Sequence, residues 1–84
     1  YDLPIEDQDK ISGAIETLEN KKFDSVYIKQ LRGNIKELKV KKYRLVFFIY
    51  NETIYFVRIF IKKTNKTPKN EIDIAEKHYK LITS

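Results

Sequence analysis

Residues 43–61 read YRLVFFIYNETIYFVRIFI, two apolar runs separated by a short polar break at 51–53. Both runs are rich in β-branched and aromatic residues, which favour strands, and together they hold seven of the eleven aromatic residues of the chain. The stretch therefore predicts a β-hairpin that carries the core. Because each run is apolar on both faces, we expect both faces of the hairpin to be covered.

The length of the hairpin loop decides which side chains share a face. A three-residue loop over 51–53 pairs Tyr50 with Ile54 and puts Arg44, Arg58 and Lys62 on one face. A two-residue loop instead puts Arg58 on the face opposite Arg44. Only the three-residue loop gathers these cations into one site.

The residues before the hairpin predict two helices and one further strand. Pro4 and the acidic residues after it suit the first turn of a helix over about 4–20, where apolar residues recur at three- and four-residue spacing. A shorter helix is expected from about Ser25 to Gly33, since glycine tolerates the positive φ of a helix end. The alternation after Gly33 predicts a strand over 35–40.

After the hairpin, Thr67 and Pro68 predict the N-cap and first residue of a last helix. Its buried stripe should consist of Ile72, Ala75, Tyr79 and Ile82. The whole pattern predicts an α+β fold: an N-terminal helical hairpin packed on a small antiparallel sheet, a three-strand meander, followed by a C-terminal helix. Eighty-four residues allow one domain.

The composition excludes several classes of site. Without cysteine there is no disulfide, thiolate nucleophile or zinc knuckle, and two glycines are too few for a P-loop or dinucleotide fingerprint. The longest apolar run, 45–50, is far shorter than the roughly 20 residues that span a bilayer. We therefore expect a soluble, cytoplasmic protein that uses no cofactor and no metal.

The net charge of +5 is unevenly distributed. Residues 1–20 carry six acidic side chains and one lysine, whereas the other 64 residues carry 16 basic and six acidic ones. Positive charge beside aromatic residues favours a polyanion ligand, nucleic acid first, although lysines can also serve solubility alone. The candidate cations are Lys39, Lys41, Lys42, Arg44, Arg58, Lys62, Lys63 and Lys66.

Two arginines lie within apolar strands, where each charge needs an anion. Arg44 and Arg58 either form structural salt bridges, for example to Glu37 or to an acid of the first helix, or they face phosphate. His78 could move protons or simply face solvent. Tyr43, Tyr50 and Tyr55 either stack on bases or lie in the core or on the sheet surface.

Three sequence strings resemble a known family: LRGNIKELK at 31–39, YR at 43–44, and FIKKTNKTP at 60–68, followed by Glu71, Ile72 and Ala75. They are similar to the HigB-type, phage-related branch of the RelE/ParE toxin superfamily, over about residues 12–82. The resemblance implies a single RelE-like toxin domain over 1–84, without the strand that usually opens the family. It also implies the toxin of a type II toxin-antitoxin system, a hydrolase that acts as a ribosome-dependent mRNA endoribonuclease.

The resemblance further implies partners and residue roles. The partners are a helix-turn-helix antitoxin and the ribosome with its mRNA; operator DNA is contacted only through the antitoxin, and no membrane is involved. Arg44 matches the family's tyrosine-linked arginine, and Lys62 and Lys63 match its lysine pair. We expect catalysis by Arg44, Arg58, Lys62 and Lys63 without a metal, and RNA binding by Lys39, Lys41, Lys42 and Lys66.

Two departures from the family pattern keep another function open. Lys39 stands where arginine is usual, and Arg58-Ile59-Phe60 stands where His-Gly-Phe is common, so a proton carrier is missing. Both departures favour the alternative of a non-catalytic, ParE-like toxin or a nucleic-acid- or protein-binding module. A purely structural phage or mobile-element protein is the third possibility.

Overall fold

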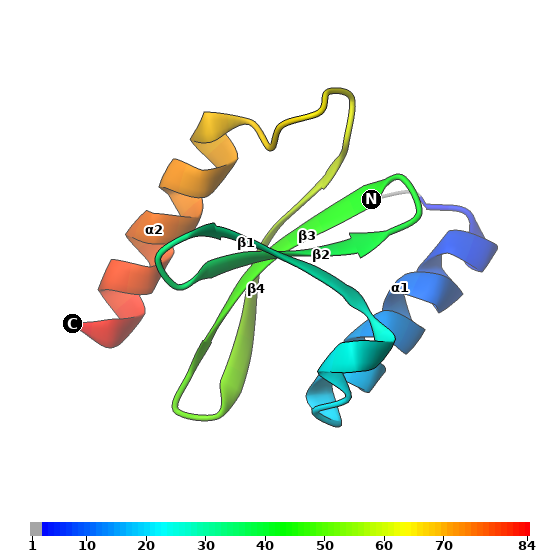
Figure 1. Cartoon of the computed structure of the whole chain (residues 1–84), viewed down its shortest axis with the longest axis horizontal. Helices are drawn as coiled ribbons and strands as arrows, with labels where there is room; N and C mark the ends of the chain where they lie inside the picture. The colour runs from blue at the N-terminus through cyan, green and yellow to red at the C-terminus, as the bar shows by residue number, and fades with distance from the viewer. Residues whose placement is uncertain (1–2) are drawn as a thin grey trace.

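The computed structural model describes residues 3–84 and has one four-stranded antiparallel sheet in the order β1-β2-β3-β4, with a helix on each side (Figure 1). The elements are α1 (Ile5–Glu19), a 3-10 turn (Phe23–Ser25), β1 (Tyr27–Arg32), β2 (Ile35–Val40), β3 (Tyr43–Tyr50), β4 (Thr53–Ile61) and α2 (Lys69–Thr83). The α+β class, the first and last helices and the strands of 35–61 are confirmed.

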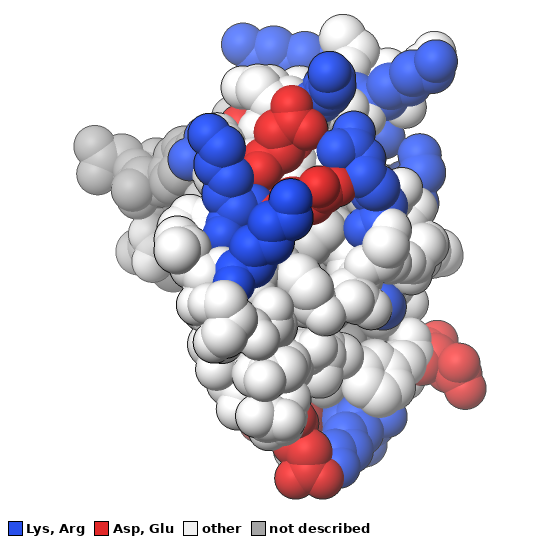
Figure 2. Space-filling model, turned by 90° about the vertical axis from the view of Figure 1, so that its left-hand side faces the viewer, with Lys and Arg blue, Asp and Glu red and all other residues white. Residues whose placement is uncertain are grey.

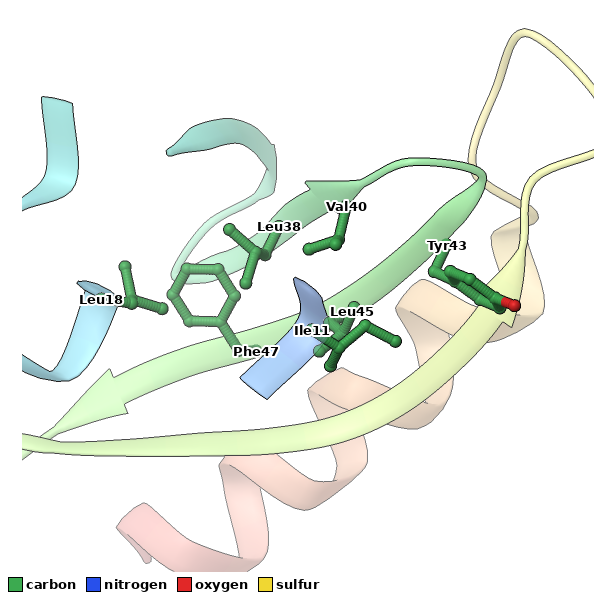
Figure 3. Packing of buried hydrophobic residues seen from close by; sticks show 7 residues of the cluster. All are labelled: Ile11, Leu18, Leu38, Val40, Tyr43, Leu45 and Phe47. Carbon is green, nitrogen blue, oxygen red and sulfur yellow. The ribbon is translucent and has the colours of Figure 1, made fainter. Parts of the chain in front are cut away.

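β3 is buried on both faces, as its composition predicts. Phe47 points toward α1 and packs with Ile11 and Leu18, whereas Val46 packs in a second cluster with Ala75 of α2. Figure 3 shows the first cluster, in which α1 lies against the inward side chains of β2 and β3. Burying each large apolar side chain contributes roughly 1.5–3 kcal/mol, so these two clusters hold the three layers together.

The second helix predicted from Ser25 to Gly33 is wrong, because this segment forms β1 and the sheet has four strands instead of three. The three-residue spacing of Ile28 and Leu31 looks helical, but in a strand it places the two side chains on opposite faces. Each face of the sheet has its own hydrophobic cluster. Ile28 packs in the first cluster, which includes α1 and is called the α1 cluster below, and Leu31 packs in the second, which includes α2 and is called the α2 cluster. Gly33 does have a positive φ of 54°, in the β1–β2 turn.

The β3–β4 loop has two residues, the shorter of the two lengths considered from sequence, since Tyr50 pairs with Thr53. Asn51 and Glu52 both have positive φ, as a tight two-residue hairpin turn requires. A β-bulge then shifts the register between positions 46 and 47 of β3, so that Val46 still lies opposite Arg58. The pairing near the cations is therefore the one expected of a three-residue loop, and the bulge keeps Arg58 on the face of Arg44 although the loop has two residues.

The last helix starts one residue later than predicted. Pro68 occupies the N-cap position, and the hydroxyl of Thr67 donates to Glu37 instead of capping α2. Ala75 is fully buried, and Tyr79 and Ile82 pack against the same cluster, as the predicted stripe requires. Within residues 3–84, neither helix has the length and apolar character needed to cross a membrane.

Candidate functional site

A small basic hollow opens on the sheet face that α2 covers in part. Strand pairing sets Tyr27 opposite Lys39 and Lys39 opposite Arg44, so three neighbouring strands present one row of side chains. The hollow, here called the basic pocket, has a volume of about 240 Å³ and is lined by Tyr27, Ile28, Lys29, Glu37, Lys39, Arg44 and Lys62. The structure thus brings together three of the cations predicted from sequence: Lys39, Arg44 and Lys62.

Figure 2 views the molecule from the side of α2. Lys and Arg side chains gather in the upper half of this face around a few acidic ones, while its centre is mostly uncharged. On this face, the positive charge therefore lies mostly toward the upper end of the view. Concentration of like charge attracts an anion more strongly than the same charges spread over the surface.

Arg44 forms the floor of the basic pocket and is only 8% exposed. Its Nη1 donates to the backbone carbonyls of Lys41 and Tyr43 at 2.8 and 2.9 Å, and its Nε lies 3.9 Å from Oε2 of Glu37. Within residues 3–84 these contacts leave Nη2 without a hydrogen bond. Arg44 is thus held in a fixed orientation by one anion and two carbonyls.

Glu37 is the acidic residue of the basic pocket and is 2% exposed. Its Oε1 accepts a hydrogen bond of 2.5 Å from the Thr67 hydroxyl, while Oε2 faces Arg44. Both carboxylate oxygens therefore point at internal partners. The other charged groups that line the pocket are all cations.

Lys39 and Lys62 line the pocket from different elements. Lys39 is exposed, and its Nζ lies 5.9 Å from the ring centroid of Tyr27. Lys62 follows β4 directly, and its backbone N–H donates to the carbonyl of Lys42 at 2.9 Å. This backbone bond extends the β3–β4 pairing by one residue and fixes where the Lys62 side chain starts.

Arg58 shares the face of Arg44 but does not line the basic pocket. Its Nε and Nη2 donate to the carboxylate of Glu71 at 2.8 and 2.9 Å, a two-point ion pair that joins β4 to the first turn of α2. The arginine side chain is 40% exposed and the glutamate 8%. This is the salt bridge that sequence analysis weighed against phosphate binding, although its partner comes from the last helix rather than the first.

Lys41 and Lys42 lie in the β2–β3 turn and are not part of the basic pocket. The Lys41 ammonium donates to Asp7 of α1 at 2.8 Å, and the Tyr43 hydroxyl donates to the same carboxylate at 2.7 Å. The hydrogen bond from Lys41, with that from Tyr43, lowers the pKa of Asp7, and Asp7 in turn raises the pKa of both donors. Lys42 lies 5.6 Å from the Tyr43 ring centroid, next to this network.

The remaining predicted cations, Lys63 and Lys66, are exposed in the segment that joins β4 to α2. They lie close in sequence to Lys62 but do not line the pocket. Across residues 3–84 no group of three His, Asp or Glu side chains could hold a metal ion. Separately, the three predicted cations that line the basic pocket, Lys39, Arg44 and Lys62, suit it to an anion.

In a comparison with protein-family models, residues 1–80 match phage derived protein Gp49-like (DUF891). The chain belongs to the Gp49-like family. This family is in general one of RelE- and HigB-like toxins. No curated protein matches the Gp49-like chain.

Two residues that line the pocket of this Gp49-like chain, Tyr27 and Lys29, were not among the candidates from sequence, and neither was Thr67, which donates to the pocket residue Glu37. Tyr27 and Lys29 were hidden because their segment was expected to be helical. Reading it as a strand antiparallel to β2 would have placed Tyr27 beside Lys39. Thr67 gave no such signal, because a threonine before proline is equally typical of an N-cap.

Proposed function

We propose that this Gp49-like protein is a HigB-type toxin of a type II toxin-antitoxin system and cleaves mRNA on the ribosome without a metal. The observation that carries the proposal is the convergence of Lys39, Arg44 and Lys62 in one basic pocket, in a chain from a family of RelE/HigB-like toxins. Three cations around a hollow of this size match a phosphodiester with its flanking ribose.

The proposed reaction uses the nucleophile of the RNA itself. The ribose 2′-oxygen attacks the adjacent phosphorus, the bond from phosphorus to the 5′-oxygen breaks, and the products are a 2′,3′-cyclic phosphate and a 5′-hydroxyl. One pocket lysine in its neutral form accepts the 2′-proton, and another donates a proton to the leaving 5′-oxygen. The ribosome supplies the in-line geometry that so small a pocket does not impose.

Arg44 is assigned the stabilisation of charge on the phosphorus oxygens. Its Nη1 contacts hold the guanidinium still, so little reorganisation is needed when that charge develops. Lys62 is the better placed member of the lysine pair, since it lines the pocket and Lys63 does not. Arg58 is engaged by Glu71 and contributes chiefly by holding α2 against the sheet.

The neutralising partner in this proposal is an antitoxin with a helix-turn-helix domain and an acidic segment. Four cations line the basic pocket against one carboxylate, whose charge Arg44 already faces. An acidic segment laid over the pocket would relieve the repulsion among the lysines and block phosphate. Binding should accordingly weaken as salt is added.

Growth of bacteria that express the protein without a partner tests the proposal. We expect arrest with the wild-type chain and normal growth with Lys39→Ala/Lys62→Ala, which removes two pocket cations and leaves the core unchanged. Lys10→Ala/Lys77→Ala is the matched control, because it removes two exposed lysines on α1 and α2 and should still arrest growth. Normal growth with abundant, folded wild-type protein would contradict the proposal.

A second function, a non-catalytic ParE-like toxin or a binding module, is favoured by one observation. Both strand arginines face carboxylates, Glu37 and Glu71, and the basic pocket lacks a histidine. Such a protein would bind its target through the same pocket and leave RNA intact. Arrested growth with uncleaved mRNA would identify this second function.

A further inference from the structure

Tyr27 is the most exposed aromatic side chain among residues 3–84, at 78%. It starts β1, the edge strand next to the basic pocket, and it belongs to neither hydrophobic cluster. An aromatic ring that packs into no core contributes little to folding, and its exposure costs free energy of hydration. A single exposed ring needs no explanation in itself, but Tyr27 also lines the basic pocket, where its ring is available to a ligand.

The surroundings of Tyr27 match what single-stranded nucleic-acid sites contain. Such sites combine cations that follow the backbone with an aromatic side chain on which a base stacks. Here Lys39 lies directly opposite Tyr27 and Arg44 directly opposite Lys39, so the Cα atoms of Tyr27 and Arg44 are two strand spacings apart, about 10 Å. One nucleotide can therefore reach from the ring to the phosphate-binding cations.

We propose that Tyr27 is the platform on which one base of single-stranded RNA stacks while Lys39 and Lys62 hold the neighbouring phosphate. The choice of RNA rests on the proposed function. Stacking is tolerant of base identity because every base has a π-face, so Tyr27 adds affinity and position rather than sequence selectivity. The cation above the ring, Lys39, is free to follow the incoming phosphate because it is exposed.

The tyrosines considered from sequence are less suited to this role. Tyr43 is 2% exposed and its hydroxyl is bound to Asp7. Tyr55 stacks on Phe48 with ring centroids 5.2 Å apart, and Tyr50 packs against the α2 cluster. These rings are buried or packed on other side chains of the protein, whereas the exposed ring of Tyr27 lies beside the basic pocket.

A single-tryptophan reporter tests stacking directly. The chain contains no tryptophan, so Tyr27→Trp has one indole, whose fluorescence is quenched when a base stacks on it. Phe23→Trp is the matched control, since this exposed aromatic lines a different hollow, beside Phe47 and Ile49. The probes are a short single-stranded RNA, an abasic ribose-phosphate oligomer of equal length, and polyglutamate.

We expect RNA to quench Tyr27→Trp strongly, and the abasic oligomer and polyglutamate to leave it nearly unchanged. Phe23→Trp should respond to none of the three. Equal quenching by RNA and the abasic oligomer, or quenching by polyglutamate, would overturn base stacking and point to charge alone or to an acidic peptide. Absence of quenching by RNA at low salt would overturn it as well.

Affinities of side-chain variants give the second measurement. Tyr27→Ala should bind the RNA about five- to 150-fold more weakly, the loss expected for one stacked base, whereas Tyr27→Phe should bind like wild type. Both variants should melt like wild type, because the side chain is exposed. If Tyr27→Ala binds and cleaves RNA like wild type, base stacking is refuted and the proposed nuclease activity is unaffected. If RNA quenches Tyr27→Trp but the wild-type protein does not cleave mRNA, the nuclease activity is refuted and base stacking is unaffected.

Discussion

Replacing Arg44 by alanine separates the structural role of its charge from its chemical role. Arg44 is 8% exposed, and its Nε lies 3.9 Å from Oε2 of Glu37, which is 2% exposed. Arg44→Ala leaves this carboxylate buried with Thr67 as its hydrogen-bond donor. An uncompensated buried charge is strongly unfavourable, so we expect the variant to be much less stable.

The expected loss is large for a domain of this size. Breaking a buried ion pair by removing one partner costs about 3–5 kcal/mol. At about 0.05–0.15 kcal/mol per residue, 84 residues give roughly 4–13 kcal/mol of total stability. With about 4–8 °C of Tm per kcal/mol, Arg44→Ala should melt about 12–40 °C below wild type.

Thermal melting of three proteins measures this loss: wild type, Arg44→Ala, and the double variant Arg44→Met/Glu37→Gln. The double variant removes both charges and keeps an oxygen that can accept the Thr67 hydrogen bond, so it should recover most of the lost stability. It should nevertheless fail to cleave mRNA, because the guanidinium is gone. Folding and chemistry are thus read from the same pair of variants.

Two results would refute this reasoning. If Arg44→Ala melts within a few degrees of wild type, the pair with Glu37 does not stabilise the fold. If the folded double variant cleaves mRNA at the wild-type rate, Arg44 has no part in the reaction. Either result would remove one of the two roles that the structure suggests for this residue.

Three further outcomes are expected. The hydrogen bond from Lys41 lowers the pKa of Asp7 from its ordinary value of 3.8. The ionised carboxylate therefore stabilises the fold above that pH, and this stabilisation is lost as the pH falls below it. In an acid titration, Asp7→Asn should therefore lose less stability over this range than wild type. A double-mutant cycle of Arg58→Ala and Glu71→Ala should give a coupling of about 1–3 kcal/mol by denaturant unfolding, and a value near zero would exclude their two-point pair as a stabilising contact. Four pocket cations less one carboxylate leave about three effective positive charges. The logarithm of the association constant for single-stranded RNA should therefore fall with the logarithm of the salt concentration with a slope near −2, and Lys39→Ala should make this slope shallower by about 0.7. Equal slopes for wild type and variant would place Lys39 outside the phosphate contacts.

The hairpin of 43–61 could be predicted from sequence because its residues are apolar on both faces, and β3 is in fact buried on both. The segment of β1 could not be, since strand residues that face two different cores occur at spacings typical of a helix. Ile28 and Leu31 show this directly, one in each cluster. Periodicity distinguishes helix from strand only where one face of the strand is solvated.

The candidate site was predicted in part, for reasons that depend on particular residues. From sequence, a three-residue loop put Arg44, Arg58 and Lys62 on one face, and Val46 does lie opposite Arg58, but the loop is one residue shorter and a bulge in β4 restores the register. Bulges leave little trace in a single sequence, so such a register cannot be derived from loop length. Tyr27 was missed because its role depends on the strand that periodicity concealed.

Cleavage of ribosome-bound mRNA by the purified protein tests the central claim most directly. The account predicts 2′,3′-cyclic phosphate and 5′-hydroxyl ends on mRNA in translating ribosomes, undiminished by a metal chelator that spares the ribosome, and no cleavage by Lys39→Ala/Lys62→Ala. Intact mRNA in the presence of folded wild-type protein, or cleavage that persists unchanged in the double variant, would contradict it.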